Sequence, residues 1–133
     1  MKSLGTSIVF LIAGCGMSVK VTPHGETRYP ANPNKDLKFF ASPFEGMEAV
    51  GVIEIEGANF DKYQDVRTRA GEEAAKLGAD ALVVVREIRQ DGSYWQDTGK
   101  RYTIGSSVYA KYEKVAATYP VCVYIAVRQH QEK

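Results

Sequence analysis

Apolar and polar residues alternate with two different periods in the middle of the chain, which predicts a strand followed by a helix. The run 50–56 is rich in β-branched residues, and its second half alternates isoleucine with glutamate, as in a strand with one buried face. Over 60–77, apolar residues recur every three or four positions, as on an amphipathic helix. Asp61 and Gln64 have capping-box spacing, and Gly78 stands where a glycine ends a helix.

The second half of the chain reads as further strands joined by turns. Residues 81–85 are apolar at successive positions, as in a strand buried on both faces. Residues 89–101 hold two turn signals and are expected to form a loop or hairpin tip. The alternation over 102–112 predicts a half-buried strand, 116–120 a turn, and the apolar run 121–127 the last strand.

These elements predict an α+β domain after a Pro-rich tether. One amphipathic helix packs on a mixed sheet of about four strands, in the order β-α-β-β-β, and the helix makes a right-handed parallel crossover between the first two strands. One helix cannot cover both faces of such a sheet. The second face must be covered by Phe39, Phe40 and Phe44, by another copy of the chain, or by a partner. An uncovered apolar face is an interaction surface.

The N-terminal third differs in composition from this domain. Residues 1–14 hold one basic residue, Lys2, and a short apolar run that ends in small residues, which is the layout of a signal peptide. The run is too short to span a bilayer, which needs about 20 apolar residues. Residues 15–45 contain four of the five prolines, as in an extended tether. The compact domain is therefore expected over 46–128, followed by a polar tail at 129–133.

The sequence Ile12-Ala13-Gly14-Cys15 resembles the lipobox of bacterial lipoproteins. The resemblance implies cleavage between Gly14 and Cys15, a diacylglycerol on the Cys15 thiol, and an acyl chain such as palmitate on the new amine. Gly16 stands where such lipoproteins carry an inner-membrane-retaining Asp, so the resemblance implies the outer membrane, with the domain facing the periplasm. An ordinary signal peptide with a chance cysteine, and the start of a buried helix, are the alternatives.

Charge and cysteine content narrow the function classes. The chain holds 17 Lys and Arg and 16 Asp and Glu, and this balance gives no electrostatic footprint for nucleic acid. Cys15 is taken by the lipid in this interpretation, which leaves Cys122 without an intramolecular disulfide partner. Cys122 stands in an apolar run, as an inert buried thiol does. The alternative is an intermolecular disulfide.

Two further segments resemble a known group of domains. The stretch 72–85, which includes Gly-Ala-Asp-Ala, and the stretch 104–110 are similar to small bacterial envelope domains of the RcsF and YbjQ type. RcsF-type proteins are outer-membrane lipoproteins with a Pro-rich linker, and they signal envelope stress. They are held by two disulfides, whereas this domain has only Cys122, so the signalling role does not transfer residue by residue.

The sequence offers little catalytic chemistry. We expect no catalytic residues, no metal site, and no cofactor beyond the covalent N-terminal acyl and diacylglycerol groups, because His24 and His130 have no ligands at suitable spacing. One cluster has binding character, with the single Trp beside tyrosines and cations. Its members are Tyr94, Trp95, Lys100, Arg101 and Tyr102. The alternative is a hairpin whose aromatic side chains pack on the strand.

Together these observations predict a lipid-anchored bacterial envelope protein, and they predict its location better than its activity. We expect a non-enzymatic interaction or envelope-sensing module. Its partner would be another envelope protein, or a second copy that binds the uncovered sheet face. The alternative function is a small-ligand or cell-wall glycan binding domain that uses the loop around Trp95.

Overall fold

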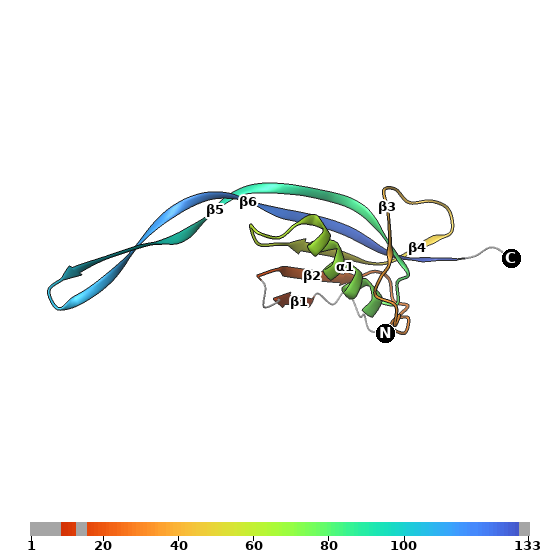
Figure 1. The fold of residues 1–133 in the computed structure, drawn as a ribbon. Coiled ribbons are helices and arrows are strands. Elements are labelled where there is room, and N and C mark those ends of the chain that lie inside the picture. Colours follow the sequence, from red (N-terminus) through yellow and green to blue (C-terminus); the bar gives the residue numbers. More distant parts are fainter. Residues whose placement is uncertain (1–8, 13–15, 131–133) are drawn as a thin grey trace.

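The computed structural model describes the backbone of residues 9–12 and all of residues 16–130. In this described part of the chain, six strands form one mixed sheet in the order β1-β2-β4-β6-β5-β3, and one helix lies against it (Figure 1). Neighbouring strands are antiparallel, except that β3 is parallel to β5. The elements are β1 (Val9–Ile12), β2 (Ser18–Pro23), β3 (Lys38–Phe40), β4 (Met47–Glu56), α1 (Tyr63–Lys76), β5 (Ala81–Ile104) and β6 (Ser107–Gln129).

The expected α+β fold with four strands in the order β-α-β-β-β is wrong, because the protein is mostly β and its sheet is curled. The residues expected to form a loop at 89–101 belong to β5, and those expected to turn at 116–120 belong to β6. The expected strand 102–112 instead folds back on itself at Gly105 and Ser106. Gly105 has φ +64°, and a glycine first in a two-residue loop suits a tight hairpin turn.

Two turn signals in β5 and β6 have other roles in the structure. Gly92 lies under the ring of Tyr119, where a Cβ would stand 2.5 Å from Cε2, so this glycine allows a close approach rather than a turn. The carbonyl of Pro120 accepts a hydrogen bond from the Gly57 N–H at 2.9 Å. β4 ends at Glu56 on this side of β6, so the missing N–H of Pro120 costs no ladder bond.

The strand–helix–strand unit β4-α1-β5 keeps the expected parallel direction but not the expected adjacency. β4 and β5 are both antiparallel to β6, which lies between them. The two strands therefore run the same way while each pairs with the last strand of the chain. β6 can take this central place because it is apolar at successive positions from Val121 to Val127.

The helix predicted over this region is confirmed as α1. Gly78 has φ +83°, as expected for the left-handed residue that ends a helix. The helix starts one residue later than the predicted capping pair Asp61 and Gln64 suggested. Lys62 is the N-cap residue, and its N–H donates to the Asp65 side chain at 2.8 Å. Asp61 instead closes the preceding turn by accepting from the Ala58 N–H at 2.7 Å.

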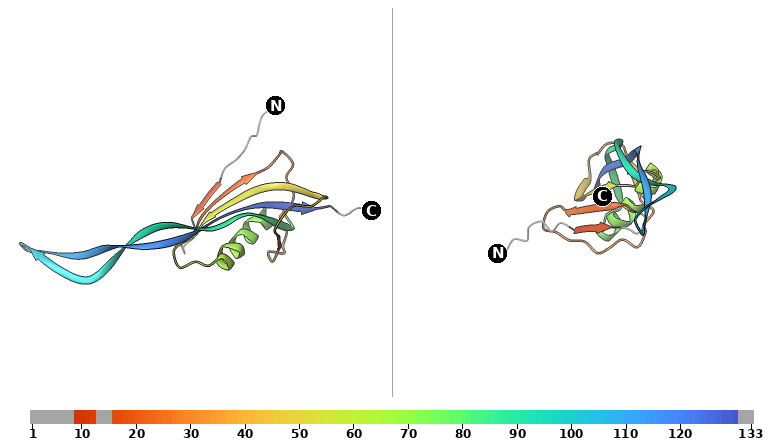
Figure 2. Two further views of the ribbon diagram at one scale, coloured as in Figure 1. Left: turned by 90° about the horizontal axis from the view of Figure 1, so that it is seen from above. Right: turned by 90° about the vertical axis from the view of Figure 1, so that its left-hand side faces the viewer.

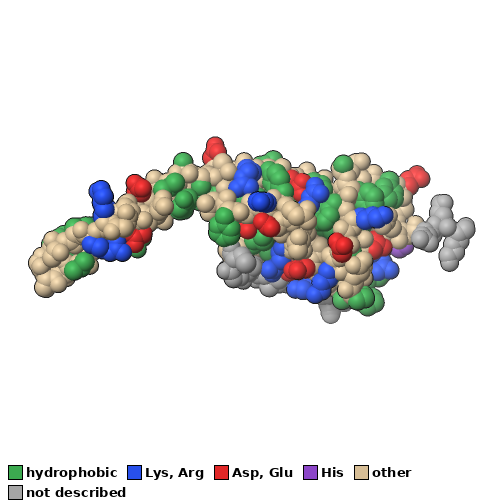
Figure 3. Space-filling model, in the orientation of Figure 1, with side chains coloured by type: hydrophobic (Ala, Val, Ile, Leu, Met, Phe, Trp, Pro, Cys, Tyr) green, Lys and Arg blue, Asp and Glu red, His purple; other side chains and the backbone are tan. Residues whose placement is uncertain are grey.

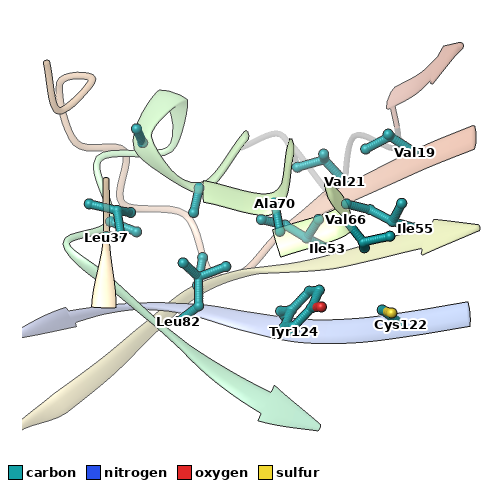
Figure 4. Close-up of a cluster of buried hydrophobic side chains, with 14 of the residues drawn as sticks. Val19, Val21, Leu37, Ile53, Ile55, Val66, Ala70, Leu82, Cys122 and Tyr124 are labelled. Atoms are coloured by element: carbon teal, nitrogen blue, oxygen red, sulfur yellow. The ribbon is translucent and has the colours of Figure 1, made fainter. Parts of the chain in front are cut away.

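The core lies between α1 and one face of the sheet. Val66 and Ala70 of α1 point at Ile53 of β4 and Tyr124 of β6, and all four are fully buried (Figure 4). Alternation along each strand places the next residues on the opposite face. We call this opposite side, away from α1, the outer face.

The Pro-rich segment was expected to be a free tether, but most of it belongs to the fold. β2 pairs with β4 and buries Val19 and Val21 in the core. Further along, Asn32 Nδ2 donates to the Ala79 carbonyl at 3.0 Å, and Leu37 is buried. Prolines here do not prevent pairing, because the residues between them supply the buried side chains and the hydrogen bonds. Of the tether predicted to start at residue 15, only residue 16 precedes the first buried side chain, Met17, among those described.

Past the ends of the neighbouring strands β3 and β4, β5 and β6 continue as a two-stranded ribbon that projects from the domain (Figure 2). We define the arm as residues 90–119, from the pair Gln90–Tyr119 to the turn. Its strands span about 40 Å at ~3.3 Å per residue. Among the described residues, the arm strands pair only with each other, because β4 ends at Glu56 and β3 pairs only with 81–83 of β5.

Candidate interaction surfaces

The predicted binding residues all lie on the β5 strand of the arm, but they do not converge on one site. Tyr94 and Tyr102 alternate with Trp95 and Arg101 in strand register, so the two pairs lie on opposite faces of the ribbon. Trp95 is 67 % exposed. Of the predicted residues, Lys100 lines a polar cavity of about 360 Å³ together with Asp97 and Lys111. The lining of that cavity includes neither Trp95 nor the two tyrosines.

A bulge in the arm fixes one of these residues, Arg101. The register shifts between Asp97 and Arg101, which leaves extra residues on β5. Asp97 accepts from the Gly99 N–H at 2.9 Å and pairs with both terminal nitrogens of Arg101 at 3.0 and 3.1 Å. These bonds, the backbone one first, hold the pKa of Asp97 below its ordinary value. Arg101 is therefore oriented along the ribbon by a partner in its own strand.

The outer face of the sheet carries an uncovered row of aliphatic side chains. Half-buried Val52, Val121, Val123 and Ile125 lie on it by alternation. Val85 stands at a second bulge, where Val85 and Arg86 oppose Val123, and it is 55 % exposed.

Of the three phenylalanines expected to cover this face, only Phe40 packs directly on it. It contacts a small cluster with Ala81, Val83 and Val127 at one end of the face. The Phe39 ring instead lies on the helix side, edge to face with Tyr124 at 5.4 Å. Phe44 contacts the Phe40 ring but is 49 % exposed. The rest of the row stays open to solvent.

A groove crosses the open part of the outer face. Its volume is about 290 Å³, and its floor includes Val121 and Val123. Charged side chains line its rim, with Lys20 Nζ 3.8 Å from Glu54 Oε2 and Arg86 nearby. An apolar floor with a polar rim is the usual composition of a protein–protein contact surface.

The helix side holds a polar cluster that sequence reasoning missed. The Glu87 carboxylate accepts from Arg67 at 2.6 and 2.8 Å and from the Tyr124 hydroxyl at 2.6 Å. The Phe39 ring lies 5.0 Å from the Arg67 guanidinium. The only signal in the sequence is that a tyrosine in a buried strand needs a hydrogen-bond partner, and nothing in the pattern names that partner.

The electrostatics of this cluster are those of a satisfied structural pair. Arg67 first, and then Tyr124, hold the pKa of Glu87 below its ordinary value of 4.5. Burial, and then the bond to Glu87, raise the pKa of Tyr124 well above its ordinary value. Each group is thus fixed in one protonation state near neutral pH, and none is poised to exchange a proton. This arrangement supports packing rather than acid–base chemistry.

A further cavity lies where the arm joins the domain. It has a volume of about 460 Å³, and its walls come from the start of the described chain, from the end of β4 and from the arm. Gly16 and Ser18 face it together with Asp91, Gly92 and Tyr119. The chain that follows Cys15 therefore enters the fold at the root of the arm.

The cysteine and histidine predictions have mixed outcomes. Cys122 is a fully buried free thiol whose pKa is raised by burial, so an intermolecular disulfide would require the core to open. Cys15 and Gly14, the predicted lipidation and cleavage residues, lie outside the described residues. His130 is not a loose end, because its Nε2 lies 2.7 Å from Glu48 Oε1. His24 is exposed.

The described residues contain no group of three or more His, Cys, Asp or Glu side chains that could hold a metal ion. Within this same part of the chain, no helix is long and apolar enough to cross a membrane. Comparison of the chain with protein-family models, with curated proteins and with solved structures finds no match.

Proposed function

We propose that this chain is a non-enzymatic, lipid-anchored protein of the bacterial envelope that binds another envelope protein through the outer face of its sheet. The observation that carries the interaction is the open aliphatic row of Val52, Val121, Val123 and Val85. Contiguous apolar surface of this kind is uncommon on proteins without a partner. A second copy of the chain is the alternative occupant of the same surface.

The anchor in this proposal is Cys15, acylated after removal of residues 1–14. In the outer membrane, two or more acyl chains would hold the protein stably. Removal of residues 1–14 takes β1 out of the sheet, which makes β2 its edge strand. Because Met17 is already buried, the domain would lie at the membrane surface rather than far from it, facing the periplasm.

The alternative function, a small-ligand or glycan binder, has only the exposed Trp95 in its favour. Its neighbours Tyr94 and Tyr102 lie on the opposite face of the ribbon. A binding site for a sugar or another small ligand is usually concave, with aromatic and polar groups that converge on the ligand. The outer face therefore supports the protein-binding proposal better.

Site-specific photocrosslinking tests the proposal in cells. A photoreactive residue replaces Val85 on the outer face, and the control replaces Thr68, an exposed residue on α1 at the other side of the sheet. We expect a discrete crosslinked species from position 85 that is lost when Val123 is changed to Glu, and none from position 68. Equal products at both positions, or none at position 85, would rule out this surface as the binding site.

A further inference from the structure

The far end of the arm is apolar although nothing in the domain covers it. Residues 102–110 contain no charged side chain. Ile104 is 62 % exposed and Val108 67 %, and the rings of Tyr102 and Tyr109 stack on each other with centroids 5.5 Å apart. We call residues 102–110 the tip. Exposed apolar groups gathered on so small an element indicate a site of contact.

Apolar side chains lie on both faces of the tip, which narrows the kind of contact. Tyr102 faces Tyr109 across the ribbon, and Ile104 shares their side by alternation. Val108 lies opposite Thr103 on the other side. A flat protein surface would cover one face of a ribbon and leave the other in water. An apolar medium that surrounds the ribbon covers both of its faces.

Basic residues stand directly behind the tip on both strands. Lys100 and Arg101 precede it on β5, and Lys111 follows it on β6. Figure 3 shows Lys and Arg side chains on the arm, set back from its end. Residues 97–114 hold four cations against two carboxylates, whereas the whole chain is close to neutral. Cations that flank an apolar segment complement the negative charge of lipid headgroups.

We propose that the tip inserts into the interfacial region of an anionic lipid bilayer. From the Tyr102–Tyr109 pair to the turn the hairpin extends about 10 Å, which matches the ~5–10 Å depth of the headgroup and acyl boundary. Tyrosine rings favour this boundary. Deeper insertion is excluded, because the open strand edges would lose their hydrogen bonds to water.

The tip is a different surface from the outer face of the sheet, through which the proposed function binds a protein. It also fits the start of the described segment 16–130, because Gly16 lines the cavity at the root of the arm. An anchor at Cys15 would place the membrane beside that root, and the arm is long enough to reach along the bilayer and dip its tip into it. The tip contact does not itself require the acyl chains.

A tryptophan reporter at the tip tests the insertion directly. In the full-length chain, Trp95→Phe combined with Ile104→Trp leaves one Trp, at the tip. The protein is mixed with vesicles of phosphatidylcholine and phosphatidylglycerol that carry brominated acyl chains, which quench only Trp near the hydrocarbon. We expect quenching and a blue shift of the emission. The matched control, Trp95→Phe with Phe44→Trp, places the Trp at a site that is 49 % exposed between β3 and β4, away from the arm and its root, and we expect no quenching there.

Two charge variants test the anionic part of the proposal. In the tip reporter, Lys100→Gln with Lys111→Gln is expected to weaken vesicle binding roughly 25-fold, at about fivefold per cation. Lys35→Gln with Lys38→Gln removes the same charge from the domain and is expected to change little. All four side chains are exposed, so unchanged thermal unfolding checks the fold.

Three outcomes would overturn the proposal. The first is a tip Trp that is as unquenched as the control Trp. The second is equal quenching in vesicles of phosphatidylcholine alone, which would remove the role of anionic lipid. The third is a tip that crosslinks to a protein while it stays unquenched, which would make it a protein-docking element. Failure of the proposed protein-binding function would instead appear as no crosslinked product at position 85 in the otherwise unchanged protein, or as equal products at positions 85 and 68.

Discussion

At the scale of single residues, one carboxylate, that of Glu87, joins helix α1 to the sheet through an ion pair and a hydrogen bond. Glu87 is only 14 % exposed at its side chain and binds Arg67 and Tyr124. Removing the charge of Glu87 leaves the Arg67 guanidinium and the Tyr124 hydroxyl with a weaker acceptor in a partly buried place. Such losses are costly, because a buried donor loses both its partner and its water.

We predict that Glu87→Gln lowers the free energy of unfolding by about 2 kcal/mol at pH 7. Since the pKa of Glu87 is lowered in the folded state, its stabilisation is present above about pH 4.5 and is lost as the pH falls through the folded pKa. The variant should therefore lose less stability than the wild type on acidification. Urea unfolding at a series of pH values measures both effects.

Glu54→Gln is the matched control for this prediction. Glu54 is 45 % exposed and 3.8 Å from Lys20, and exposed pairs of this kind contribute about 0–1 kcal/mol. We expect little change in stability or in its pH dependence. If the two variants behave alike, the cluster around Glu87 does not hold the helix to the sheet.

At the scale of elements, the arm is separate from the hydrophobic core. None of the buried core residues lies within 90–119, and an isolated two-stranded ribbon adds little stability of its own. Replacing residues 92–117 by Asn-Gly would join Asp91 to Thr118, which are cross-strand partners, through a favoured two-residue turn. We predict that the melting temperature changes by only a few degrees.

Thermal unfolding followed by circular dichroism measures this effect of arm removal. A cooperative transition near that of the full chain would show that the domain folds without the arm. A chain that no longer unfolds cooperatively would mean that the arm is part of the folding unit, and that its exposed side chains have partners in the domain. The full-length chain with Trp95→Ala is a control for loss of the exposed ring alone.

Elements whose own sequence shows a clear hydrophobic periodicity could be predicted from the sequence. Elements fixed by contacts with residues distant in the sequence could not. The helix and the apolar runs of β4, β5 and β6 follow from periodicity, because each carries its own buried face. The arm has no buried face, so 89–101 and 116–120 resembled a loop and a turn, and 102–112 resembled a single strand rather than a hairpin end. The bond from Tyr124 to Glu87 joins residues 37 apart, and pairing of β2 with β4 depends on the register of two strands rather than on either sequence alone.

At the scale of the whole molecule, three features point to one arrangement. The outer face is open on the sheet, the arm extends from one end of the domain, and the chain enters the fold at the root of that arm (Figure 1). An N-terminal lipid would hold the domain against the membrane with the arm alongside it. The outer face would then remain available for a protein in the same compartment.

The central claim is that Cys15 is the acylated N-terminus of the mature protein, and intact-mass spectrometry of the protein purified from membranes tests it most directly. The account predicts a chain without residues 1–14 that carries the added mass of a diacylglyceryl group and an acyl chain. The lipid should incorporate labelled palmitate and should be lost in Cys15→Ser. An unmodified chain that still begins at Met1 and is recovered from the soluble fraction would contradict it.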